Sequence, residues 1–199
     1  MIGVRQSAAS WSPDGRVVAF TQTSPDTGGD LYVLEMDAER KPRPFVQTKF
    51  TEGSPRFSPD GRWIAYCSNE SGRMEVYVTP YPGPGPKIQI STDGGADPVW
   101  KGTGGELYYR NGDRMMIVEV GAQPSFRAGK PRLLWEGRYN HGLNSSCGAP
   151  GPSSSNYDVT PDGRRFLMIQ EGDQDVPATR IHVVLNWSEE LRRLTRKEK

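Results

Sequence analysis

Short apolar runs, each led by a polar turn, recur along the chain. Four ten-residue stretches align without gaps from residues 11, 57, 100 and 159, and they read WSPDGRVVAF, FSPDGRWIAY, WKGTGGELYY and VTPDGRRFLM. In each, an apolar residue precedes the turn and a β-prone run follows it, which predicts two strands joined by a tight bend. A unit that returns at this spacing, about 40 to 60 residues, indicates a repeat architecture.

The turn has the same chemistry in three of the four copies. Proline presets φ at the second turn position, aspartate suits the third, and glycine accepts the left-handed backbone at the fourth. The residues of this turn motif are Ser12, Pro13, Asp14, Gly15, Ser58, Pro59, Asp60, Gly61, Thr160, Pro161, Asp162 and Gly163. In the third copy, Thr103 replaces the aspartate and Gly104 keeps the required glycine. Turn formation therefore explains the aspartates without a calcium ion.

Further strand-like segments complete each repeat, so four strands per repeat are expected. The predicted second strands cover residues 17–20, 63–66, 107–109 and 166–169. The predicted third and fourth strands cover 31–36 and 45–48, 75–79 and 87–91, and 115–120 and 132–135. In the fourth repeat a third strand is predicted at 180–185, and no fourth strand follows it.

These units predict an all-β fold, a β-propeller of four-stranded antiparallel blades. The propeller part covers 1–187, with blades near 5–50, 51–93, 94–136 and 150–187 and a long loop insertion near 137–156. Residues 188–199 are predicted to form a short helix and a charged tail, because Ser188 suits an N-cap and bases follow acids along the segment.

Composition and charge exclude several function classes. The chain has 199 residues, a formal net charge of +1 and no clustered excess of lysine and arginine, which argues against nucleic acid as a partner. No apolar stretch is long enough for a membrane span, and the start lacks a signal peptide. The 23 glycines and 17 prolines favour short strands and turns over long helices.

Motifs for catalysis or cofactor binding are absent from the sequence. It has no kinase loops, no Walker motif and no Gly-x-Ser-x-Gly nucleophile elbow. The histidines, His141 and His182, are interpreted as a loop and a strand residue, and Cys67 as a small buried residue. We therefore expect no catalytic residue, no metal site and no cofactor in this chain.

The repeated W-S-P-D-G-R signature with its I-A-[FY] strand resembles that of the TolB-type, WD-repeat-like β-propellers. More narrowly, PYPGPGPKIQISTDGGADPVW, GKPRLLWEGRY, NYDVTPDGRRFLMI and IHVVLNWSEELRRL resemble the C-terminal propeller of bacterial membrane-anchored Ser/Thr protein kinases. That resemblance implies a parent with a cytoplasmic kinase domain, one membrane span and an extracytoplasmic propeller that acts as a sensor or scaffold.

The family's propellers contain more blades than the four visible here. An open arc of blades leaves apolar faces and strand edges uncovered. We therefore expect the chain to be a piece of a longer product, with upstream blades or another chain needed to close the ring. The alternative is an unusually small ring that these four blades close by themselves. Expressed alone, it should form oligomers or aggregate.

A binding surface is expected where loops enter the innermost strands at the channel mouth. The loops at 52–55, 94–98 and 155–157 carry the candidates Glu52, Asp97 and Asn156. The expected partner is a protein, a peptide or a small ligand of unknown identity.

Three function classes follow from the resemblance. The leading hypothesis is a non-catalytic protein-interaction or ligand-sensing module of a receptor-type Ser/Thr kinase, on the extracytoplasmic side of a bacterial membrane. The alternative is a periplasmic TolB-like envelope scaffold. A weaker alternative is the gating propeller of a prolyl-oligopeptidase-type serine peptidase, which would require a hydrolase domain.

Overall fold

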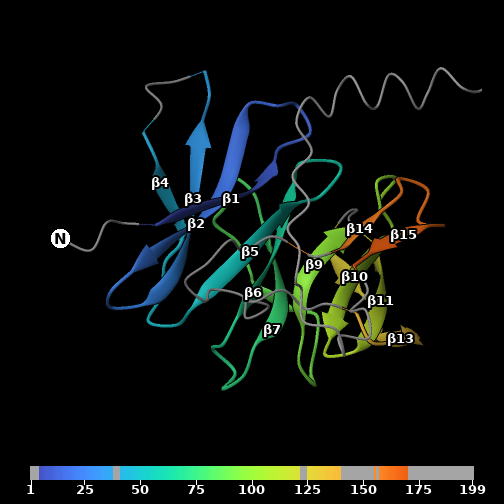
Figure 1. The fold of residues 1–199 in the computed structure, drawn as a ribbon. Coiled ribbons are helices and arrows are strands. Elements are labelled where there is room, and N and C mark those ends of the chain that lie inside the picture. The colour runs from blue at the N-terminus through green and yellow to red at the C-terminus, as the bar shows by residue number, and fades with distance from the viewer. Residues whose placement is uncertain (1–4, 38–40, 122–124, 140–154, 156, 170–199) are drawn as a thin grey trace, which may run out of the picture.

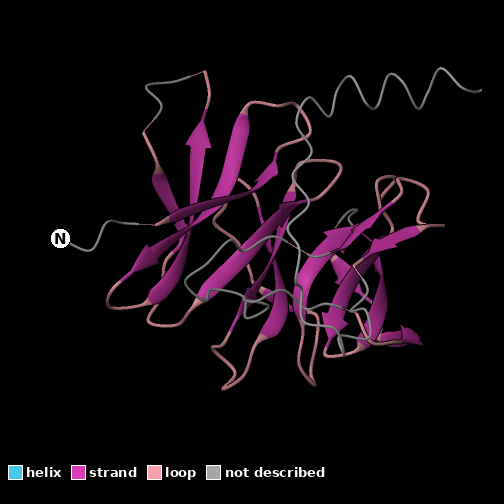
Figure 2. Ribbon diagram, in the orientation of Figure 1, coloured by secondary structure: helices cyan, strands magenta, loops and turns pink. Residues whose placement is uncertain are grey.

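The structure, a computed structural model, describes residues 5–37, 41–121, 125–139, 155 and 157–169. Every regular element in these ranges is a β-strand, and the strands group into separate antiparallel sheets (Figures 1 and 2). Within the same ranges no helix could cross a membrane. The fold is all-β, as the repeat pattern predicts, and it forms part of a propeller.

Blades one and two are four-stranded meanders in which each strand pairs with the next. Blade one consists of β1 (Gln6–Trp11), β2 (Val17–Ser24), β3 (Gly28–Glu35) and β4 (Arg43–Val46). Blade two consists of β5 (Glu52–Phe57), β6 (Trp63–Ser68), β7 (Glu75–Pro80) and β8 (Ile88–Gln89). Several of these strands extend beyond the predicted apolar runs, because ladder pairing continues into the flanking polar residues.

Blade three has one more strand than predicted. It consists of β9 (Ala96–Trp100), β10 (Glu106–Asn111), β11 (Arg114–Gly121), β12 (Arg127–Ala128) and β13 (Arg132–Glu136). The long strand β11 pairs with β13 along its first half and with β12 at its end. The outer edge of this blade is therefore split into two short strands, because β11 is longer than either partner.

Blade four is described by two strands, β14 (Tyr157–Val159) and β15 (Phe166–Met168). The strand predicted at 180–185 and the helix predicted within 188–199 lie outside the described residues. So do most of the loop insertion and Asn156.

The turn after each innermost strand is closed by a backbone hydrogen bond. In blade one the Gly15 amide donates to the Ser12 carbonyl at 2.9 Å, and Gly15 has a φ of 71°. The Ser12 hydroxyl donates to the Asp14 carboxylate at 2.5 Å, and this bond lowers the pKa of Asp14. The turns at Ser58, Lys101 and Thr160 are closed by the same bond.

Adjacent turns also touch one another. A Cβ at Gly61 would lie 3.3 Å from Cδ of Pro13, which belongs to the turn of the preceding blade. A Cβ at Gly102 would lie 2.7 Å from Cα of Pro161, in the turn of blade four. Glycine at these two positions therefore lets neighbouring turns approach closely.

Apolar side chains bury the contacts between blades. Phe57 and Ile64 of blade two pack against Val17, Ala19 and Val33 of blade one. Trp100, Leu107 and Tyr109 of blade three pack against Ala65, Val76 and Val78 of blade two. Val159 and Phe166 of blade four pack against Tyr108, Met115 and Ile117 of blade three. Each blade thus has a preceding face and a following face, named for the neighbour that each contacts.

Cys67 in β6 is fully buried, which agrees with its interpretation from the sequence. It is held in a disulfide, and the described part of the chain contains no free thiol. The other cysteine of the sequence, Cys147, lies outside the described residues.

Candidate functional site

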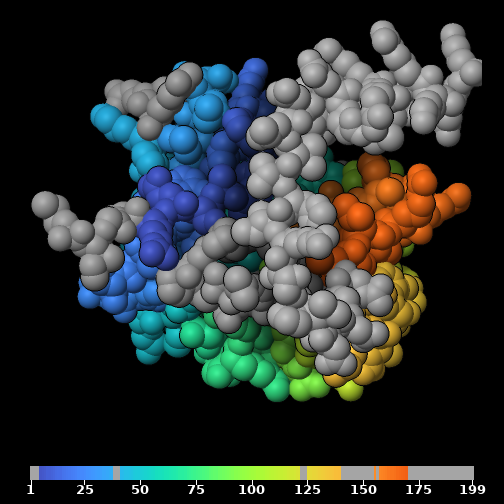
Figure 3. Space-filling model, in the orientation of Figure 1, coloured from blue at the N-terminus to red at the C-terminus, as the bar shows by residue number. Residues whose placement is uncertain are grey.

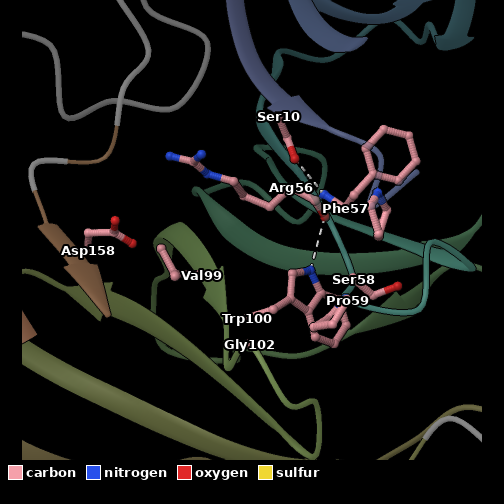
Figure 4. Close-up of a pocket in the computed structure, with 10 residues that line it drawn as sticks. Ser10, Arg56, Phe57, Ser58, Pro59, Val99, Trp100, Gly102 and Asp158 are labelled. Atoms are coloured by element: carbon pink, nitrogen blue, oxygen red, sulfur yellow. Dashed lines mark hydrogen bonds between the residues drawn. The ribbon is translucent and has the colours of Figure 1, made fainter. Parts of the chain in front are cut away.

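A cavity of about 420 Å³ opens where the innermost strands of the four blades come together (Figure 4). The innermost strands β1, β5, β9 and β14, with the turns after the first three, supply its walls. The lining residues are Ser10, Pro13, Arg56, Phe57, Ser58, Pro59, Val99, Trp100, Gly102 and Asp158. A pocket that draws on every blade is placed where propellers have their central channel.

Among the residues that the structure describes, Arg56 is the only cationic side chain that lines this cavity. Its Nη1 donates to the Ala9 carbonyl of blade one at 2.6 Å, and its Nη2 donates to the Ser155 hydroxyl at 3.1 Å. Its Nε is buried and has no hydrogen-bond partner among the described residues. A buried donor without an acceptor costs about 1–3 kcal/mol, so the guanidinium is held in place while one donor stays unsatisfied.

Neighbouring side chains fix the wall around Arg56. The Trp100 indole donates its Nε1 hydrogen to the Arg56 carbonyl at 3.0 Å. The Phe57 amide donates to the Ser10 hydroxyl at 3.0 Å. Both bonds are drawn in Figure 4, and they connect blades one, two and three at the cavity.

The cavity carries charges of both signs. Asp158 is exposed and lines it from blade four, on a different strand from Arg56 (Figure 4). One of its carboxylate oxygens accepts the Val159 amide at 2.8 Å. A wall with one cation, one anion, an indole and small hydroxyls suits a polar ligand such as a peptide segment, because charged and apolar groups can both be matched.

The hydroxyl of Ser58 and metal-binding side chains are the candidates for further chemistry at this cavity. Ser58, one of its two serines, donates its hydroxyl to the Asp60 carboxylate and accepts the Trp63 amide, so it serves the turn. No group of three or more metal-binding side chains occurs among the described residues. His141 and His182 lie outside those residues.

Glu52, a candidate from the sequence, is placed away from the cavity. It is part of β5 and is 1% exposed, so the expected loop at 52–55 is wrong: these residues belong to the strand, and Glu52 and Gly53 pair with Ser68 and Cys67 of β6. The Thr48 and Ser68 hydroxyls donate to its Oε1 at 2.5 and 3.4 Å, while Oε2 has no partner among the described residues. Burial, with a smaller contribution from the Asp30 carboxylate, raises the pKa of Glu52 to about 7.

Asp97, the second candidate, also lies in a strand where a loop was expected. It belongs to β9, is 7% exposed and adopts a φ of 52°. Its carbonyl accepts the buried Tyr157 hydroxyl at 2.7 Å, which ties blade three to blade four. Ser54 has a φ of 53° at the same place in blade two. Both positions coincide with breaks in strand register, which explains how a strand continues where the sequence suggested a loop.

The structure therefore does not bring the sequence candidates together. Glu52 and Asp97 do not line the cavity, and Asn156 is outside the described residues. The residues that the sequence reasoning missed are Arg56 and Asp158. In the aligned repeats they stand directly before the residue that precedes the turn, where the other two copies have Ser10 and Val99. Charged side chains at that innermost position were the signal that could have found them.

Comparisons with known proteins place the fold without placing the chain in a family. No family model matches it. An uncharacterised protein of Agrobacterium fabrum, Atu1656, is 33% identical over 72 residues, which are 34% of this chain and 22% of that protein. A protein of Streptomyces coelicolor named as tricorn protease homolog 2 is 38% identical over 68 residues, which are 34% of this chain and 6% of that protein.

Among solved structures, one named as TolB from Agrobacterium tumefaciens is similar at a TM-score of 0.60 and 18% identity. The match covers 85% of this chain and 59% of that one. The chain thus spans less than two thirds of the length of the proteins it matches. At this identity the likeness concerns the fold, and the described sheets have a TolB-like propeller fold.

Proposed function

We propose that this chain is a non-catalytic binding module in which a peptide or small polar ligand enters the axial cavity and contacts Arg56. The observation that carries the proposal is the placement of the one lining cation, with an unsatisfied buried Nε, at a pocket to which all four blades contribute. A ligand carboxylate or carbonyl group there would accept charge-assisted hydrogen bonds, which are the stronger kind.

The sequence resemblance supports a finer proposal for the protein around this module. The segments that resemble the propeller of bacterial receptor-type Ser/Thr kinases extend over blades two to four and beyond. In such a parent the propeller would sense or anchor an extracytoplasmic ligand and would transfer no phosphate itself. The genomic reading frame before codon 1 tests this: a kinase domain and one membrane span support it, whereas a cleavable signal peptide would favour the envelope scaffold.

Binding at the cavity is tested with the full chain and a positional-scanning library of hexapeptides with free carboxyl ends. Tryptophan emission reports binding, because Trp100 forms part of the wall. We expect the tightest peptides to bind Arg56→Gln at least about tenfold more weakly, since one charge-assisted hydrogen bond is lost.

The matched control is Arg62→Gln, because Arg62 is exposed on the turn side of blade two and does not line the cavity. Circular dichroism confirms that both variants are folded. Equal affinity of the wild type and Arg56→Gln, or a library without any binder, would contradict the proposal.

A further inference from the structure

The two end blades of the arc each present a face that every internal blade buries. Blade one and blade four lie at opposite ends of the described arc (Figure 3, blue and orange), and no apolar cluster of the described residues contains side chains of both blades. The preceding face of blade one and the following face of blade four therefore have no blade against them among the described residues.

Strand register identifies the equivalent positions on the preceding faces. Trp11, Phe57, Trp100 and Val159 each pair with the second residue of the strand after the turn in their own repeat, or with its direct equivalent. Phe57 is 7% exposed and Trp100 is 9% exposed, because each packs on the blade before it. Trp11, at the same position in blade one, is 56% exposed. Trp11 therefore occupies a position that packs on a neighbouring blade in blades two and three, but it is exposed in blade one.

The following faces show the same contrast. Ala19, Ala65 and Tyr108 are at most 1% exposed, since the next blade covers each of them. Leu167 occupies the equivalent place in blade four and is 75% exposed, and Ile169 two residues later is 54% exposed. The outermost faces therefore expose, at matching positions, the two halves of the interface that is buried inside the chain.

The face of blade one is apolar beyond Trp11. Trp11 pairs with Val18 and Val18 pairs with Leu34, so the three side chains form one row across β1, β2 and β3. Beside this row the rings of Phe20 and Tyr32 stack, with a distance of 5.8 Å between the ring centroids. Paired residues share a sheet face, so this row continues the surface that in blades two and three packs on a neighbour.

We propose that blade one docks on blade four of a second copy of this chain, and that two copies close one ring of eight blades. The same type of contact already joins consecutive blades within the chain, so the second copy supplies a complementary surface without any new interface chemistry. A head-to-tail contact repeated between two copies closes when the rotations sum to a full turn, and eight blades lie within the range that propellers adopt. This inference concerns assembly and does not rest on the ligand proposed for the cavity.

The test measures the mass of the full chain in solution by size-exclusion chromatography with light scattering. The wild type should be a dimer at micromolar concentration. Trp11→Ser and Leu167→Asp should each raise the dimer dissociation constant by roughly 30-fold or more, as expected for a central anchor residue. The matched control is Leu133→Ser, because Leu133 is 50% exposed on the outer strand β13, away from both end faces.

Mixing distinguishes head-to-tail docking from a symmetric contact between two blade-one faces. In an equimolar mixture of Trp11→Ser and Leu167→Asp, a mixed dimer keeps one interface intact and collects both substitutions in the other. Such mixtures should therefore contain more dimer than either variant alone. In a symmetric blade-one contact, Leu167→Asp would dimerise like the wild type.

Three results would overturn the proposal: a monomeric wild type, a dimer that Leu167→Asp leaves intact, or a ladder of larger oligomers in place of a closed dimer. Both substituted side chains are exposed, so the variants should fold, and circular dichroism checks this. Leu167→Ser replaces Leu167→Asp if the charged variant unfolds, with the same expected result.

Discussion

Two fully buried glutamates show how differently adjoining regions of one propeller treat a carboxylate. Glu75, at the start of β7, and Glu52, at the start of β5, are each 1% exposed. Glu75 accepts Arg73 Nε at 2.8 Å, the Gly94 amide at 2.9 Å and the Ser91 hydroxyl. Glu52 accepts two hydroxyls at one oxygen, and its other oxygen has no partner in the described ranges.

The difference shows that two carboxyls at the same depth can have very different hydrogen-bond partners. Glu75 has a cation and a backbone amide beside it, which compensate a negative charge. Glu52 lies near Asp30 and forms no ion pair within the described ranges, so burial and the neighbouring carboxylate favour its neutral form. Near neutral pH, the contact between blades one and two therefore includes a titrating group.

Removing the Ser91 hydroxyl should change the free energy of unfolding more than the other substitutions below. Its hydroxyl donates to Glu75 and accepts the Val76 amide at 2.7 Å, and the side chain is fully buried. Ser91→Ala leaves a carboxylate and an amide short of a partner, so it should lower the free energy of unfolding by about 3 kcal/mol. Urea unfolding measures this, with the exposed Ser71→Ala as control. A loss similar to that of the control would show that Glu75 does not depend on Ser91.

The second largest expected effect is a dependence of the free energy of unfolding on pH, caused by Glu52. Its folded pKa of about 7 lies above the ordinary value of 4.5, so its favourable contribution is complete below pH 4.5 and disappears as the pH rises to about 7. The free energy of unfolding should fall by about 2 to 3 kcal/mol over this pH range. Glu52→Gln should flatten this part of the curve, measured by urea unfolding between pH 4.5 and 8.

The control for this pH series is Glu35→Gln, which removes an exposed carboxylate that pairs with Arg43 at the surface. It should keep the slope of the wild type. If Glu52→Gln and the wild type lose stability in parallel, a group other than Glu52 titrates.

Ser68→Ala should have the smallest effect of the three. The Ser68 hydroxyl donates to Glu52 over a long 3.4 Å, whereas Thr48 donates to the same oxygen at 2.5 Å. We expect a loss of about 0.5 kcal/mol for Ser68→Ala and a larger loss, about 1 to 2 kcal/mol, for Thr48→Ala. Thermal unfolding at pH 8, where Glu52 is ionised, separates the two. The reverse order would mean that Ser68 is the main donor.

Strands and bends were predictable because they depend on local chemistry. The bend at Pro13 and Gly15 and the apolar runs after each turn depend only on neighbours in sequence, so the repeats could be aligned and the blades placed. The split edge of blade three was not foreseen, since it depends on how far β11 extends past its partners.

The candidate site was predicted less well, for a physical reason. Glu52 and Asp97 are polar residues before a strand, and such residues usually indicate a loop. Here Ser54 and Asp97 adopt a positive φ, and the strand register breaks at both positions. The strands therefore continue through these breaks and include Glu52 and Asp97. Arg56 carried a sequence signal in its position two residues before the turn, but contacts between residues distant in sequence place it at the cavity.

The closeness of successive bends links the blades at the level of single atoms. Because Gly61 leaves room for the Pro13 ring and Gly102 for Pro161, a bulkier residue in one bend would push on the adjacent blade as well as on its own hairpin. Anyone who transplants or redesigns one blade of this arc would therefore have to treat two consecutive bends as a single unit of sequence.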